Sequence, residues 1–182
     1  MTKPTIGESY RLSPTEQARM LGKLMLYWDG QWFLKTAEVV GLEETIALNA
    51  RVRASFGRIE MRTLLKALGK RQADDLPDAM RLLRTYAETF MGDRLRAEYR
   101  LLDDQRAEVL VRRCAAHEGA RRAALPRTDQ ACVACETLWG AWLEVLLPDT
   151  AVDVQYPEQM GKGDPRCRFI IQVDTPGALP SG

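Results

Sequence analysis

Residues 97–114 read AEYRLLDDQRAEVLVRRC, and in this stretch the pattern of the chain changes from helical to extended. Apolar and charged residues alternate along 97–101, and along 107–111 the apolar Ala107, Val109 and Val111 alternate with Glu108 and Leu110. This is the period-two pattern of half-buried strands. Between the two runs lie Asp103, Asp104 and Gln105, which favour a turn. The stretch therefore predicts a hairpin whose second strand ends at Cys114.

The chain before the hairpin has the spacing of helices. Ser13, Pro14 and Glu16 predict a helix start, because Ser13 can cap the first turn, proline suits its first position, and Glu16 stands three residues after the cap. Four apolar side chains then share one helical face: Leu21, Leu24, Met25 and Trp28. We expect a break or kink over residues 28–33, followed by a second helix that ends at Val40.

Two further helices are predicted before the hairpin. The first runs from Glu43 to Leu68 and ends at Gly69, a glycine C-cap, although Gly57 inside it weakens the helical pattern. Its candidate core positions are Ile46, Ala50, Ile59, Leu64, Leu65 and Leu68. A polar linker over 70–75 then leads to a helix over 77–90.

After the hairpin, a short helix is expected over 117–124 and a long one from a cap at Thr128 or Asp129 to Leu147. Alternating residues predict two more strands, over 152–156 and 169–173. The predicted fold is α+β, with a helical N-terminal half followed by an antiparallel sheet of about four strands packed against a long helix. We divide the chain into a helical part (1–92), a cysteine-containing α+β part (93–175) that forms one compact unit with it, and a loose tail (176–182).

Composition limits the function classes. The 182 residues are 46% apolar, enough for a sizeable core, and carry 26 basic against 25 acidic side chains. This balance argues against a general nucleic-acid binder, which normally has a basic excess. No apolar stretch is long enough to span a bilayer, and the first residues lack the apolar core of a signal peptide. We expect a cytoplasmic protein that neither enters a membrane nor binds nucleic acid.

The four cysteines and the single histidine all lie in the last third of the chain, spaced like metal ligands. Cys114 and His117 form one pair, Cys132 and Cys135 form another, and Cys167 follows alone. Thiolates and an imidazole from separate elements suit zinc or iron, so these five residues are the predicted metal ligands. The alternatives are two disulfides, or buried cysteines that act as small apolar residues, as Cys135 facing the sheet would.

Two acids next to these cysteines are candidate acid–base groups. In a metal hydrolase, Glu136 or Asp164 could act as general base on a metal-bound water. The simpler alternatives are that Glu136 is a solvated surface acid and that Asp164 forms a turn. Cys132 and Cys135 lie near a predicted helix N-terminus, whose dipole is expected to lower their pKa.

The aromatic segment near residue 30 offers a second candidate site. Trp28 and Trp32 share one helical face, and Asp29 lies between them, so the three could line a ligand pocket. Core packing between the N-terminal helices is the favoured alternative for the two tryptophans. These helices are also the candidate surface for a homodimer.

Several of these motifs resemble a known family. Residues 29–33 (DGQWF), 41–43 (GLE) and 47–49 (ALN) are similar to the N-terminal signature of the aminothiazoline-carboxylate hydrolase grouping. The segment 163–169 (GDPRCRF) resembles that grouping too, and also the ending of four-vinyl-reductase-type domains, which bind small ligands and often use cysteines near a metal. The resemblance implies C–N bond hydrolysis with opening of a small sulfur-containing ring. It matches Cys114, Cys132 and Cys167, whereas Cys135 departs from the family pattern, in which many members carry an acid.

The sequence therefore predicts a metal- or thiol-dependent, hydrolase-like protein that acts on a small molecule. With zinc, the metal-bound water would be the nucleophile; without a metal, a cysteine thiolate would attack with His117 as base. The first alternative is a non-catalytic sensor or carrier that binds a small ligand or a metal. The second is a purely structural metal site.

Overall fold

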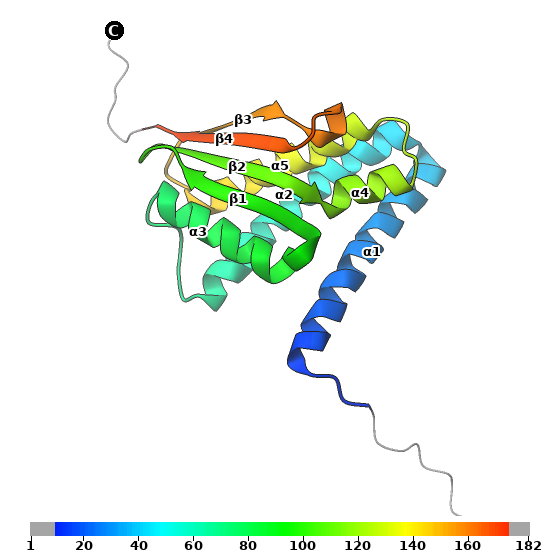
Figure 1. Ribbon diagram of the computed structural model, residues 1–182, viewed down its shortest axis with the longest axis horizontal. Coiled ribbons are helices and arrows are strands. Elements are labelled where there is room, and N and C mark those ends of the chain that lie inside the picture. Colours follow the sequence, from blue (N-terminus) through cyan, green and yellow to red (C-terminus); the bar gives the residue numbers. More distant parts are fainter. Residues whose placement is uncertain (1–9, 175–182) are drawn as a thin grey trace, which may run out of the picture.

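The computed structural model describes residues 10–174 and contains a four-stranded antiparallel sheet (Figure 1). Its strands are β1 (Leu95–Leu101), β2 (Arg106–Cys114), β3 (Val152–Glu158) and β4 (Cys167–Val173). They lie in the order β1-β2-β4-β3, and each neighbouring pair is antiparallel. The predicted hairpin is thus confirmed as β1–β2, and β2 ends at Cys114 as expected.

Helices form the remaining layers. They are α1 (Pro14–Val40), α2 (Leu42–Ala67), α3 (Leu76–Tyr86), α4 (Ala115–Arg122) and α5 (Thr128–Leu146), with a π-helical turn η1 (Ala87–Met91) and 3-10 turns η2 (Gly92–Arg94) and η3 (Met160–Lys162). The helix α5 lies against one face of the sheet, α2 packs along α5, and α1 runs away from this body (Figure 1). The predicted α+β class is confirmed. None of the helices over residues 10–174 combines the length and the apolar character that a membrane span needs.

The structure corrects two details of the helix prediction. The capping box of Ser13 and Glu16 is present, but α1 continues without a break through residues 28–33. A single glycine costs a helix only about 1 kcal/mol, so Gly30 does not interrupt a helix of 27 residues. At the start of α5, neither Thr128 nor Asp129 caps the helix, because the Thr128 hydroxyl donates to the Gly161 carbonyl and Asp129 pairs with Arg127.

One core joins the helical half to the sheet. Its buried apolar side chains come from α2, α3, β2, α5 and β4, among them Met61, Leu83, Val109, Leu143 and Ile171. On α2 the predicted core positions are confirmed in part. Leu65 is buried, and Ile46, Ala50 and Leu64 are half-buried. Ile59 and Leu68 are wrong, because each is about half exposed.

The other buried residues of α2 were not among the predicted core positions: Thr45, Gly57, Glu60 and Met61. Gly57 lies where α2 crosses α5, and a Cβ atom on it would come within 2.7 Å of the Leu138 Cδ1 atom and 3.3 Å of Trp142. A side chain at this position would hold the two helices apart. The glycine therefore sets the close approach of α2 to α5.

Glu60, one turn further along α2, is a carboxyl group inside this interface. It is 8% exposed and accepts hydrogen bonds from the Tyr86 hydroxyl and, at 2.8 Å, from the Trp142 indole nitrogen. Burial raises the pKa of Glu60 above its ordinary value, and the two hydrogen bonds offset part of this rise. Glu60 thereby links α2, α3 and α5.

We expect the glycines to respond differently to alanine and valine. Gly140→Ala should raise the free energy of unfolding by about 0.5–1 kcal/mol, because this glycine on α5 is exposed and a Cβ there has open space. Gly57→Ala should leave the free energy of unfolding unchanged. Gly57→Val should lower the free energy of unfolding by about 1–3 kcal/mol, because the larger side chain overpacks the interface. Urea unfolding measures all three, and an unchanged stability of Gly57→Val would contradict the close crossing.

The carboxyl group of Glu60 makes stability depend on pH. Since its pKa is raised in the folded state, the folded protein holds this proton more tightly than the unfolded chain does. The stability of the wild type relative to Glu60→Gln should therefore be greatest below the ordinary value of 4.5 and should fall as pH rises through the raised pKa. Urea unfolding over this pH range tests it, with Glu144→Gln on exposed α5 surface as the control. A difference that does not vary with pH would argue against a raised pKa.

Candidate functional site

The four cysteines lie on elements that meet at one end of the sheet. Cys114 ends β2 and Cys167 begins β4, where it is paired with Val111 of the neighbouring strand. Cys132 and Cys135 lie in the N-terminal half of α5, which crosses this end of the sheet. All four are free thiols; Cys167 is buried and the other three are half-buried.

The cysteines interact electrostatically, but burial keeps three of them protonated. Burial raises the pKa of Cys132 and of Cys135, and raises the pKa of Cys167 to about 11. A negative charge on any neighbouring cysteine would add to this effect, and for Cys135 those neighbours are the other three. The prediction that the helix N-terminus lowers these pKa values is wrong, because loss of water around the thiols outweighs the helix dipole.

The predicted metal ligands are only partly brought together. His117 lies half-buried on α4 and interacts electrostatically with Glu118, which in turn pairs with Arg113. Within residues 10–174, no three His, Cys, Asp or Glu side chains are arranged to hold one ion. Zinc or iron at these five residues stays a prediction.

Glu136 and Asp164, the predicted acid–base pair, are joined by a residue that the sequence did not single out. The Gln159 side-chain amide donates to the Glu136 Oε1 atom at 2.5 Å, and the Gln159 backbone N–H donates to the Asp164 Oδ2 atom at 2.8 Å. The Asp164 N–H returns a bond to the Gln159 carbonyl at 3.3 Å, so Asp164 closes a turn. This supports the turn-forming alternative for Asp164, while its acid–base role stays untested.

Gln159 carries an unpaired acceptor. It is 2% exposed, and its Oε1 atom has no hydrogen-bond partner among residues 10–174. The amide cannot be turned round to remove this defect, because Oε1 would then face the carboxylate oxygen of Glu136. A buried carbonyl without a partner costs about 1–3 kcal/mol, so its presence calls for an explanation.

The turn after Gln159 covers two of the thiols. The Met160 N–H donates to the Cys167 sulfur at 3.3 Å, and the Gly161 backbone packs so closely on Cys132 and on the Thr128 carbonyl that a Cβ atom would overlap both. Gly163 takes a left-handed φ of 101°, which lets the turn close. We call the group formed by Gln159, Glu136, Asp164, Cys132 and Cys167 the Gln159 site.

The predicted aromatic pocket around α1 is not assembled by the described chain alone. Trp28 is 67% exposed and Trp32 is half-buried, so Trp28 does not pack in the core either. Asp29 forms an ion pair with Arg53 of α2, a partner that the sequence analysis missed. Asp29 thus fastens α1 to α2.

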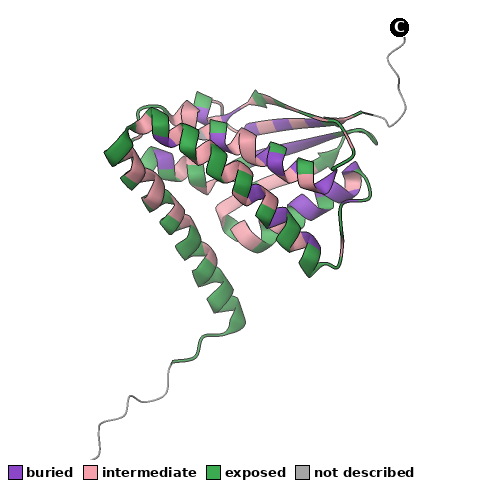
Figure 2. Ribbon diagram, turned by 180° about the vertical axis from the view of Figure 1, so that it is seen from behind, coloured by how far each residue is buried: buried purple, intermediate pink, exposed green. Residues whose placement is uncertain are grey.

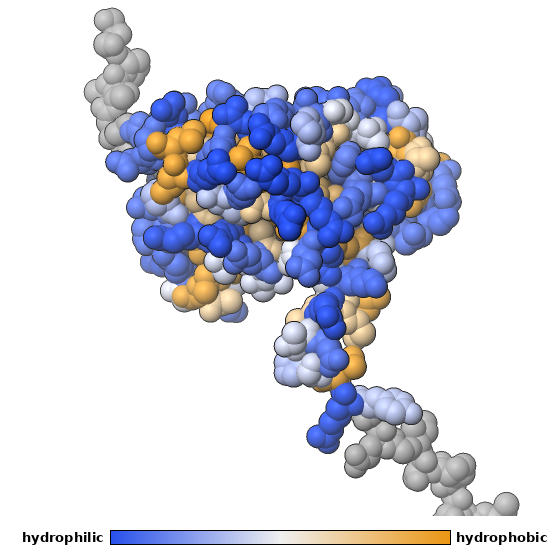
Figure 3. All heavy atoms as spheres, in the orientation of Figure 1, coloured by the Kyte–Doolittle hydropathy of each residue, from blue (hydrophilic) through white to orange (hydrophobic). Residues whose placement is uncertain are grey.

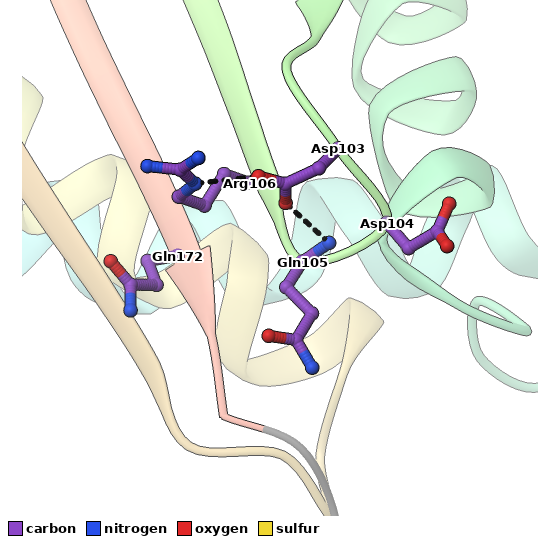
Figure 4. A pocket seen from close by; sticks show the side chains of 5 residues that line it. All are labelled: Asp103, Asp104, Gln105, Arg106 and Gln172. Carbon is purple, nitrogen blue, oxygen red and sulfur yellow. Dashed lines mark hydrogen bonds and ion pairs between the residues drawn. The ribbon is translucent and has the colours of Figure 1, made fainter.

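Two hollows lie elsewhere and contain none of the predicted site residues. One, of about 520 Å³, lies at the hairpin turn among exposed polar side chains, where Arg106 points to Asp103 and Gln172 lies on the adjacent strand (Figure 4). Since Arg106 and Cys114 are at opposite ends of β2, this hollow is remote from the cysteines. The other, of about 320 Å³, lies between η1 and β1 and includes Tyr99, whose pKa burial raises to about 12.

Comparison with known proteins identifies the family. The sequence model described as L-2-amino-thiazoline-4-carboxylic acid hydrolase matches residues 19–171, which is most of the chain. The chain belongs to this hydrolase family. The resemblance found in the sequence motifs is therefore confirmed, whereas no individual curated protein matches the chain.

Solved structures show the same fold at low sequence identity. A trafficking protein particle complex subunit 3 from Naegleria fowleri, covalently bound to palmitic acid, matches with a TM-score of 0.60 and 10% identity, covering 86% of this family member and 97% of that chain. The phenol-responsive sensory domain of the transcription activator PoxR, solved with phenol, matches with a TM-score of 0.53 and 14% identity, covering 79% and 72%. The fold of this hydrolase family member is thus also that of ligand-bound proteins.

We expect the thiols of this family member to be slow to alkylate in the folded state. With a pKa of about 11 instead of 9.0, Cys167 has roughly 100-fold less thiolate at pH 8, and only the thiolate reacts. Iodoacetamide labelling followed by peptide mass spectrometry should show Cys167 at least ten times slower in native protein than in urea, where its pKa returns to the ordinary value. Equal rates in the two states would refute the buried, neutral thiol.

Proposed function

We propose that this protein binds a small molecule carrying an amidine or amide group at the Gln159 site and hydrolyses one of its C–N bonds. The observation that supports binding is the unpaired Oε1 atom of Gln159, an acceptor on a residue only 2% exposed. Buried acceptors are satisfied by N–H or O–H donors, and an amidine presents several N–H groups to one side. A ligand reaches this atom when the Met160–Lys162 turn above it moves aside.

Glu136 supplies the acid–base chemistry in this proposal. Its Oε1 atom accepts from Gln159, and no other side chain within residues 10–174 donates to its Oε2 atom. This second oxygen can take a proton from a water molecule while the water oxygen bonds to the amidine carbon. The C–N bond then breaks, and the proton passes from Glu136 to the leaving nitrogen.

In this proposal the cysteine thiols are not nucleophiles. Burial keeps Cys132 and Cys167 protonated, so both act as small apolar wall residues. A thiolate attack with His117 as base has less support for the same reason. Zinc or iron on these sulfurs is a separate proposal, which elemental analysis and a free-thiol count of the purified protein will test.

A non-catalytic sensor or carrier is the second candidate function. Neutral thiols at Cys132, Cys135 and Cys167 favour it, because they offer a ligand an apolar surface and no nucleophile. The shared fold with a phenol-bound sensory domain adds support. Under this hypothesis the Gln159 acceptor orients a ligand that leaves unchanged.

Calorimetric titration with L-2-amino-thiazoline-4-carboxylic acid, combined with mass spectrometry of the ring-opened product, tests the proposal. We expect the wild type to bind and convert this compound. Glu136→Gln should lower turnover by about 10²–10⁴-fold, because it keeps an acceptor for Gln159 but removes the base. Gln159→Leu should weaken binding by roughly tenfold through loss of one buried hydrogen bond.

Glu144→Gln is the matched control, because this glutamate lies on the same helix but is exposed and pairs with Arg58. It should leave both binding and turnover unchanged. Binding without conversion would sink the hydrolase and favour the sensor, for which phenol is the second ligand to titrate. Wild-type behaviour of Glu136→Gln and Gln159→Leu would remove the Gln159 site from the function altogether.

A further inference from the structure

The helix α1 is long but has no buried residue. It spans 27 residues, whereas α2, α3 and α4 each bury at least one side chain. Figure 2 shows the helix only in the colours of intermediate and exposed residues, and its N-terminal half extends past the body. A helix of this kind draws little stability from tertiary packing, which is the main source of helix stability in proteins.

One side of α1 does contact the body. Gly22 lies so close to η1 and η2 that a Cβ atom there would come within 2.5 Å of the Arg94 guanidinium and 3.3 Å of the Phe90 carbonyl. Asp29 forms its ion pair with Arg53 of α2. Leu26 and Phe33, which share this side of the helix, are half-buried.

The opposite side of α1 is apolar as well. At 3.6 residues per turn, six large side chains fall within about half of the helix circumference. They are exposed by between 41% and 67% and constitute the outer face: Met20, Leu21, Leu24, Met25, Tyr27 and Trp28. Figure 3 shows apolar residues along this protruding part. A helix that is apolar on both sides is normally buried on both sides.

The outer face is large enough for a specific interface. With an area of roughly 200 Å² for each large side chain, about half of it exposed, the face presents on the order of 600 Å². This is at the upper end of the largest apolar patches on monomers, and it approaches the ~800 Å² per partner of a standard interface.

The composition of the chain points to the occupant. Residues 1–9 and 175–182, outside the described range, contain only Met1, Ile6 and Leu179 as large apolar side chains, too few to cover the outer face. An anionic lipid surface would call for a helix rich in Lys and Arg, but residues 14–28 carry only Arg19 and Lys23, with Glu16 against them. A second copy brings an identical apolar face, which is what a two-fold interface requires.

We propose that two copies of this chain dimerise through the outer faces of α1, with the two helices antiparallel. In this arrangement each protruding N-terminal half lies along the partner's helix, and the two bodies lie at opposite ends, so they do not collide. The helix dipoles also oppose each other, which is favourable. The two-fold axis passes near Leu24 and Met25, the centre of the outer face, where each residue meets its own copy.

Sedimentation equilibrium of the full chain over about 1–100 µM tests the proposal, because dimerisation follows mass action. We expect a dimer in the wild type and at least a 100-fold weaker dimer in Leu24→Glu and Trp28→Glu. Leu102→Glu is the matched control: Leu102 is 48% exposed at the hairpin turn, and its substitution should leave association unchanged. Circular dichroism of each variant checks that α1 remains helical.

Two cysteine substitutions test the orientation. In a Met20→Cys/Trp28→Cys variant, oxidation should join position 20 of one copy to position 28 of the other, because these positions lie on either side of Leu24 on the outer face. Peptide mass spectrometry distinguishes this 20–28 disulfide from the 20–20 and 28–28 disulfides of a parallel pair and from those of the native cysteines. A wild-type monomer at every concentration would overturn the proposal, as would a Leu24→Glu variant that dimerises as tightly as the wild type. A dimer that forms 20–20 and 28–28 disulfides in place of the 20–28 disulfide would overturn the antiparallel arrangement.

Discussion

The close crossing of α2 over α5 is the contact on which the rest of the structure depends. Gly57 lets the two helices approach, and one turn later the Glu60 carboxylate accepts from Tyr86 and Trp142. From Trp142 a series of aromatic contacts reaches the sheet through Trp139, whose ring centroid is 5.1 Å from that of Phe169. The crossing therefore fixes α5 against the sheet and, with it, the position of the Gln159 site.

The elements were predictable because their signals are local. Alternation along 97–111 gave the hairpin, and the Ser13–Glu16 box gave the start of α1, since each depends on residues a few positions apart. The remaining buried positions of α2 were missed for a tertiary reason. A pattern search places only apolar residues inside, and cannot foresee that Gly57 is required by a neighbouring helix or that Glu60 gains two donors from α3 and α5.

The same limit applies to the candidate site. The spacing of the cysteines in the sequence predicted a metal site, and their elements do meet at one end of the sheet. The spacing carries no information about how much water surrounds each thiol in the folded protein. Burial, which raises the pKa of Cys132, Cys135 and Cys167, is a property of the folded interior. Gln159 had no sequence signal at all, because an unpaired amide is defined only by what surrounds it.

The helix α1 is linked electrostatically to the crossing of α2 and α5. Arg53 pairs with Asp29 of α1, and both charges act on Glu60, with Arg53 lowering its pKa and Asp29 raising it. The ion pair is partly shielded from water, because the side chains of Arg53 and Asp29 are only 23% and 37% exposed. An ion pair with less water around it is screened less, and its field acts more strongly on neighbouring groups. The contact between α1 and α2 therefore bears on the protonation of Glu60 and on the α2–α5 crossing that Glu60 holds.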